Sequence, residues 1–200
     1  FNRKEQVLSV CEHNLGEESM IEVRWHGRGG QGAVTSVELL ALAAIGEGRY
    51  AQGFPSFGPE RRGAPVEAFN RINDTRIKKR QRIYRPDVVV VLDPGLITLV
   101  NVAEGLKPEG LLILNTHKPF TEVKPHIQFD GRIALVDATA IAWAELGVPI
   151  TNTTMLGALV KMTDIVKMES LSEPIEHRFG RIANKNLTAM KRAFDEVKLV

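Results

Sequence analysis

The residues best placed to do chemistry lie in the segment HGRGGQG, residues 26–32. Three of its glycines have the spacing Gly27-x-Gly29-x-x-Gly32, which is the spacing of the dinucleotide-binding fingerprint. Glycine permits a tight strand-to-helix turn and leaves backbone amides and a positive helix end open to an anion, whether a dinucleotide, coenzyme A or thiamine diphosphate. The same glycines can instead serve only to pack a helix against a strand. The motif therefore predicts either an anion site or a packing turn.

An NAD-dependent enzyme needs one further feature, an acidic residue about 20 positions after the glycines that holds the ribose hydroxyls. Glu47 has roughly that offset but lies between two glycines, where a helix is expected to end. The stretch that follows contains no carboxylate before Glu60. The pattern counts against NAD, and NADP binding would depend on Arg61 and Arg62 alone.

A second unusual segment is GFPSFGPERRGAPVEAF, residues 53–69, with three prolines and three glycines. Its irregular composition predicts a rigid loop rather than a strand or a flexible linker. One interpretation is a stiff surface turn with solvated charges. The other is a shaped loop beside the glycine loop, in which the guanidinium groups of Arg61 and Arg62 bind phosphate or carboxylate.

These loops need a scaffold, and the chain alternates strand and helix patterns. Strands are expected at residues 21–25, 65–73, 87–93, 110–115 and 132–138. Helices are expected at 33–46, after Pro94 with Leu96, Leu99 and Val100 facing inward, at 138–147, and in three C-terminal segments, 152–162, 171–180 and 184–197. This order predicts an α/β fold: a Rossmann-like, doubly wound, mostly parallel sheet flanked by helices, with a helical C-terminal tail.

The strand pattern begins just after Met20, so we expect an N-terminal extension at residues 1–19 and a single domain at residues 20–200. Whether the extension is an added segment or a genuine N-terminal helix stays open. The 44% of hydrophobic residues suffices for one core. With 26 basic and 24 acidic residues, the net charge of +2 does not favour nucleic-acid binding. Apolar runs shorter than the ~20 residues of a membrane span, with no leader pattern, predict a cytoplasmic protein.

The single cysteine, Cys11, excludes a disulfide framework and a cysteine-ligated iron–sulfur cluster or zinc site in this chain. The histidines are scattered without metal-ligand spacing, so we expect no metal site. His26 is expected to be a hydrogen-bonded residue at the rim of the loop. Asp93 and Asp137 each end a strand, where they would either face a ligand or cap the next helix.

Five segments occur in the order found in one family: GRGGQG, FPSFGPERRGAPVEA, RPDVVVVLDP, VDATAIAWAELG and NTTMLGAL. From about Ile21 to the C-terminal helix, the chain resembles the gamma subunit of pyruvate and other 2-oxoacid:ferredoxin oxidoreductases. Ala64 and Asn73 depart from residues common among relatives, glycine and serine respectively, and both are small changes.

The resemblance implies a heterotetramer with alpha, beta and delta subunits that oxidatively decarboxylates a 2-oxoacid, with pyruvate as the expected substrate. The acyl group passes to coenzyme A and the electrons to ferredoxin. Thiamine diphosphate would lie between the alpha and beta subunits and the iron–sulfur clusters on delta, so this chain would be a scaffold and coenzyme A-handling subunit without catalytic residues, inactive alone. The coenzyme A contacts carried onto this sequence are Gly29, Gly30, Gln31, Gly32, Arg61 and Arg62. Alternatives are a freestanding NADP-linked oxidoreductase and a partner-binding adaptor domain.

Overall fold

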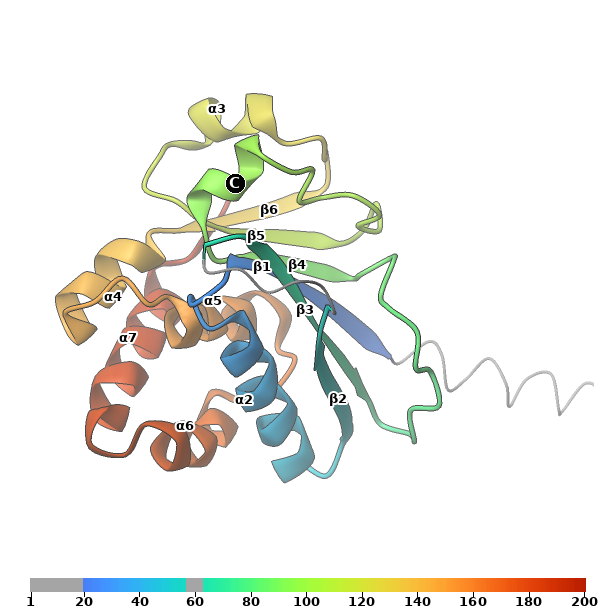
Figure 1. Ribbon diagram of the computed structural model, residues 1–200, viewed down its shortest axis with the longest axis vertical. Helices are drawn as coiled ribbons and strands as arrows, with labels where there is room; N and C mark the ends of the chain where they lie inside the picture. The colour runs from blue at the N-terminus through green and yellow to red at the C-terminus, as the bar shows by residue number, and fades with distance from the viewer. Residues whose placement is uncertain (1–19, 57–62) are drawn as a thin grey trace, which may run out of the picture.

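A mixed β-sheet forms the centre of this computed structural model, which describes residues 20–56 and 63–200. In these residues the sheet has seven strands in the order β2-β3-β1-β4-β5-β6-β7 (Figure 1). Within the same ranges, no helix combines the length and the apolar character that a membrane span requires.

The four central strands are parallel: β1 (Ile21–Arg28), β4 (Val88–Val91), β5 (Leu111–Asn115) and β6 (Arg132–Val136). Strands β4 and β5 are buried along their whole length, as expected for apolar runs covered on both faces. Antiparallel strands complete both edges: β2 (Tyr50–Pro55) and β3 (Pro65–Asn73) beside β1, and β7 (Lys198–Leu199) beside β6. The carboxyl ends of the parallel strands therefore share one edge of the sheet.

Five helices cover one face of the sheet (Figure 1). They are α2 (Ala33–Gly46), α4 (Ala138–Leu146), α5 (Asn152–Thr163), α6 (Ser172–Phe179) and α7 (Ala183–Glu196), with the 3₁₀ turns η3 (Met168–Leu171) and η4 (Gly180–Ile182) between the last of them. Helices α5 and α7 pack so closely that a Cβ on Gly157 would lie 1.9 Å from the carbonyl oxygen of Met190. Only glycine fits at that crossing.

Short elements and loops cover the opposite face: η1 (Pro94–Thr98), α3 (Phe120–Val123) and η2 (Lys124–His126). They enclose a second core that contains the other side of β4 and β5, including Val89 and Leu112. The predicted fold class, a mostly parallel α/β sheet flanked by helices with a helical C-terminal region, is confirmed.

Two local predictions were wrong. The proline- and glycine-rich stretch was expected to begin as a loop, but residues 53–55 belong to β2, because pairing with β3 compensates for their irregular composition. From residue 65 the stretch forms β3, as predicted. After Pro94 the chain forms only a five-residue 3₁₀ helix. Leu99 and Val100 follow its end and are 60% and 38% exposed, so of the predicted inward residues only Leu96 is buried.

Candidate functional site

The glycine loop lies at the carboxyl edge of the parallel strands, between the end of β1 and the start of α2 (Figure 1). This edge is where open α/β sheets bind ligands. Gly30 and Gly32 have φ angles of +97° and +83°, a left-handed conformation that favours glycine. The sequence-level expectation of a tight turn at this place is confirmed.

Backbone hydrogen bonds tie the loop to the segment that precedes β3. The amide of Gly29 donates to the carbonyl of Ala64 at 3.0 Å, and the amide of Gly63 donates to the carbonyl of Gly29 at 3.2 Å. The Gly29 amide is therefore already occupied in this conformation. The two loops that the sequence singled out do lie side by side, at least as far as residues 63 and 64.

The next amides along the loop differ from one another. The amide of Gln31 donates to the carbonyl of Arg28 at 3.0 Å. The amides of Gly30 and Gly32 have no hydrogen-bond partner among the described residues. Gly30 is exposed, and Gly32 directly precedes the first turn of α2, whose positive end attracts anions. These two amides are the donors that the loop can offer to a ligand.

A side-chain cluster holds the loop against the end of β4. The amide of Arg28 donates to Oε1 of Gln31 at 2.8 Å, and Nε2 of Gln31 donates to Oδ2 of Asp93 at 2.6 Å. Nε of Arg28 lies 3.2 Å from the same carboxylate oxygen, and its Nη1 donates to the carbonyl of Gly63 at 3.1 Å. Asp93 thus orients the one guanidinium within the glycine loop.

Sequence reasoning missed Arg28, although a cation between two glycines of an anion-binding motif was a usable signal. For Asp93 the capping interpretation holds, because Oδ1 accepts from the amide of Gly95 and caps η1. Asp137 caps α4 by accepting from the amide of Ala140 at 2.9 Å, so the capping interpretation holds for that residue. Arg61 and Arg62 lie outside the described residues.

Gly32 also has a packing role. A Cβ there would lie 2.6 Å from Nδ2 of Asn152, at the buried start of α5. The hydroxyl of Ser36 contacts the carbonyl of Asn152 at 3.2 Å and that of Gly32 at 3.3 Å. The glycine motif therefore serves close packing at Gly32 and leaves the backbone open at Gly30.

A buried amide joins the ends of the neighbouring strands. Nδ2 of Asn115 donates to the carbonyl of Leu92 at 2.7 Å and to the hydroxyl of Thr139 at 2.8 Å, and its Oδ1 accepts from the amide of Thr139 at 3.1 Å. These bonds fix the ends of β4 and β5 relative to α4. Sequence reasoning did not single out Asn115.

His26 was expected at the rim of the loop, but that prediction was wrong. The side chain is buried on the face of the sheet opposite the long helices. Its side chain has no hydrogen-bond partner for Nε2 among the described residues, and Nδ1 lies 3.7 Å from Oε1 of Glu67. Burial, followed by the charge of Arg24, lowers the pKa of His26 to about 3, against a weaker opposing effect of the Val102 backbone. The imidazole is neutral at physiological pH, so its contact with Glu67 is not an ion pair.

Among residues 20–56 and 63–200, no three or more histidine, cysteine or acidic side chains are grouped as a metal site requires. The site is thus an edge of backbone amides and one fixed guanidinium. Together with the mixed sheet, it defines an α/β protein with a glycine-rich strand-to-helix turn at the carboxyl edge of its parallel strands.

Comparison with known proteins identifies the family. Residues 22–196 match the family model described as pyruvate ferredoxin/flavodoxin oxidoreductase, and this chain belongs to that family. It is 54% identical over 179 residues to the pyruvate/ketoisovalerate oxidoreductases common subunit gamma of Thermococcus kodakarensis, covering 88% of this chain and 97% of the relative. It is 51% identical over 180 residues to the pyruvate synthase subunit PorC of Methanothermobacter marburgensis, covering 90% and 98%.

Among solved structures, the pyruvate oxidoreductase subunit PORC of Thermotoga maritima is similar, with a TM-score of 0.82 and 43% identity over 90% of this chain and 98% of that chain. The resemblance to gamma subunits is confirmed, and the chain is a subunit of an oxidoreductase. The comparisons do not support a freestanding NADP-linked enzyme.

Proposed function

We propose that this chain is the coenzyme A-handling gamma subunit of a cytoplasmic pyruvate:ferredoxin oxidoreductase, assembled with alpha, beta and delta subunits. The coenzyme A role rests on two amides, those of Gly30 and Gly32, which lie beside the guanidinium of Arg28 and have no hydrogen-bond partner in the part of the chain that the structure describes. The names of the gamma-type relatives support pyruvate as the substrate.

Coenzyme A carries phosphate groups, and the loop presents the donors that phosphate oxygens accept. The two amides and the start of α2 supply positive potential without needing a mobile side chain. Asp93 holds Arg28 and Gln31 in place before a ligand arrives, which reduces the entropy lost on binding. The carboxylate also offsets part of the charge of Arg28, so the amides carry much of the attraction.

The remaining parts of the reaction belong to partner subunits in this proposal. Thiamine diphosphate supplies the decarboxylation chemistry between alpha and beta, and iron–sulfur clusters on delta pass electrons towards ferredoxin. This chain positions coenzyme A and has no catalytic residue. The isolated chain is therefore expected to be inactive with pyruvate, coenzyme A and a viologen dye.

The test is the KM for coenzyme A in the reassembled complex. In Gly30→Val the side chain blocks the approach to the loop, so KM for coenzyme A rises while decarboxylation of the 2-oxoacid continues. Gly48→Val is the matched control, because Gly48 also has a positive φ of +82° and open space but lies beyond the far end of α2. Arg28→Gln raises KM by roughly tenfold or more, since a hydrogen bond to a charged group contributes about 1.5–3 kcal/mol.

Gel filtration must first show that each variant assembles. If Gly30→Val and Arg28→Gln both assemble and leave KM for coenzyme A unchanged, the coenzyme A role is wrong and the loop serves packing and partner binding. Activity of the isolated chain would contradict the proposed division between subunits.

A further inference from the structure

A strongly basic segment connects β3 to β4. Residues 75–86, the basic loop, contain six basic residues and no acidic one. Since the loop holds six of the 26 basic residues, the rest of the chain has 20 basic residues against 24 acidic ones, a net charge of −4. The chain is nearly neutral as a whole, but its excess positive charge is concentrated in this loop.

The basic loop begins and ends at the amino edge of the parallel strands. At the end of β3, Ile72 pairs with Ile21 at the start of β1, and Val88 at the start of β4 pairs with Val23. The glycine loop lies at the opposite, carboxyl edge (Figure 1). A partner bound to the basic loop would therefore leave the glycine loop open.

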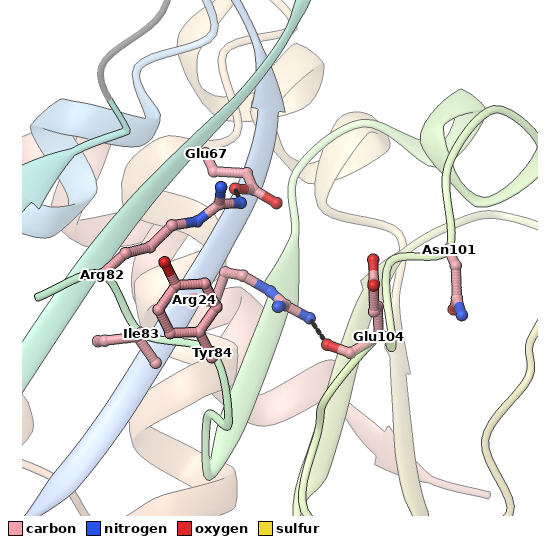
Figure 2. A pocket seen from close by; sticks show the side chains of 7 residues that line it. All are labelled: Arg24, Glu67, Arg82, Ile83, Tyr84, Asn101 and Glu104. Atoms are coloured by element: carbon pink, nitrogen blue, oxygen red, sulfur yellow. Dashed lines mark hydrogen bonds and ion pairs between the residues drawn. The ribbon is translucent and has the colours of Figure 1, made fainter.

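The basic loop is held against the sheet, although it forms no helix or strand. Nη2 of Arg71, a buried residue of β3, donates to the carbonyl of Gln81 at 2.5 Å. The guanidinium of Arg82 forms an ion pair with Glu67, toward which it points in Figure 2, and lies over the ring of Phe69, 5.6 Å from the centroid. Because these contacts fix the loop in advance, less entropy is lost when a partner binds.

Most of the positive charge of the loop is not compensated by neighbouring carboxylates. Asp74, directly before the loop, pairs with Arg49 outside it. Asp87, directly after the loop, pairs with Lys107. Four exposed cations of the loop have no ion pair in the part of the chain that the structure describes: Arg76, Lys78, Arg80 and Arg85.

The exposed groups indicate a protein partner with a carboxylate-rich face. Arginine pairs with carboxylates through two parallel hydrogen bonds. Tyr84 lies among these cations and is 67% exposed, and tyrosine and arginine are both enriched where proteins bind one another. A nucleic acid is a less suitable partner, because it would extend beyond the loop towards a chain whose remaining charge is negative.

The same surface indicates a transient partner. Permanent subunit interfaces are more hydrophobic than transient ones, and the basic loop offers charge with little exposed apolar area. Complementary charge mainly speeds association and selects the partner. The family name includes two alternative electron acceptors, ferredoxin and flavodoxin, and a contact based on charge accommodates different acceptors more readily than one based on shape.

We propose that the basic loop docks the electron acceptor of the complex, a small protein with a carboxylate-rich face. The four unpaired cations supply the attraction, and the position at the amino edge leaves the glycine loop free for coenzyme A. This inference rests on the proposed function, because it takes ferredoxin as the acceptor.

The experiment measures the Kd of fluorescently labelled ferredoxin for the reassembled complex by anisotropy. In the wild type, Kd should rise as the salt concentration increases, because salt screens exposed charges. The loop variant replaces all four unpaired cations: Arg76→Gln, Lys78→Gln, Arg80→Gln and Arg85→Gln. Its Kd should be about tenfold higher than that of the wild type and depend less on salt, since four exposed charge pairs of modest strength are lost together.

The matched control removes four exposed cations from the region of α6 and α7: Arg178→Gln, Arg181→Gln, Lys185→Gln and Lys191→Gln. It lowers the net charge by the same amount and should change Kd by less than about twofold, because these charges lie more than a screening length from the docked partner. Reduction of methyl viologen by the complex with pyruvate and coenzyme A should be the same in both variants, since a small dye needs no docking surface.

The docking proposal is wrong if the wild-type Kd does not respond to salt, or if the loop variant and the control weaken binding equally. It is also wrong if the folded loop variant no longer assembles, which would make the loop a contact between subunits. Tighter binding of a labelled single-stranded oligonucleotide than of ferredoxin would assign the loop to nucleic acid. Failure of the wild-type complex to reduce methyl viologen with pyruvate would instead contradict the proposed function, and the Kd comparison would still decide the docking.

Discussion

Acidification should destabilise this subunit through His26. Burial, then the charge of Arg24, lowers the pKa of this imidazole from 6.5 to about 3. In the unfolded chain the same group takes up a proton near its ordinary pKa. Between these two values the unfolded state binds more protons than the native state, so the free energy of unfolding falls as the pH falls.

The size of the effect follows from the two pKa values. A difference from 6.5 to about 3 corresponds to about 5 kcal/mol once the pH is below both values, since one unit is worth about 1.4 kcal/mol. From about pH 7.5 to about pH 5, where carboxylates contribute less, the loss from His26 alone is about 2 kcal/mol.

Urea unfolding of the full chain across that interval measures the loss. His26→Gln keeps a neutral polar side chain that cannot titrate, so its free energy of unfolding should fall by about 2 kcal/mol less than that of the wild type. His117→Gln removes an exposed histidine and should retain the wild-type dependence. If His26→Gln loses as much stability as the wild type over this interval, His26 is not a buried neutral group in the native state.

Two further predictions concern packing and the N-terminus. Gly157→Ala should lower the free energy of unfolding by about 3 kcal/mol, the upper end of overpacking costs, because its Cβ would overlap a carbonyl of α7. Gly46→Ala is the control: a Cβ there has nothing within 4 Å, so the change should raise the free energy of unfolding by up to about 1 kcal/mol. Equal effects of the two variants in urea unfolding would contradict the packing role of Gly157. Deleting residues 1–19 should change the free energy of unfolding by less than about 2 kcal/mol, the scale of a lost core contact, because the family match begins at residue 22. A larger loss in urea unfolding would make the segment integral to the domain.

The order of elements was predictable from local patterns. The β-branched run of β4 and the apolar spacing of α2 are properties of single segments, and each segment forms the expected element. Strand β2 was missed because its residues have weak local preference and become a strand only by pairing with β3. The helix predicted after Pro94 was too long, because nothing local indicated that the helical turn would end at Thr98.

In the candidate site, too, the local features were predictable from the sequence and the long-range contacts were not. The glycine turn and the capping role of Asp137 depend on neighbours within a few residues, so sequence reasoning could find them. The contact of Gln31 with Asp93 joins residues 62 positions apart, and that of Arg24 with Val102 joins residues 78 apart. Such contacts depend on which strands are neighbours and in which register.

The sequence by itself determined the alternating α/β architecture, the family and the place of the glycine loop, because periodicity, turn residues and motif order are read along the chain. Only the tertiary structure decided which loop amides stay open, that Asp93 orients Arg28, and that His26 and Arg24 are buried. The physical reason is that burial and hydrogen-bond partners are properties of the folded sheet. Placing β1 between β3 and β4 brings together charges and donors that no local pattern connects.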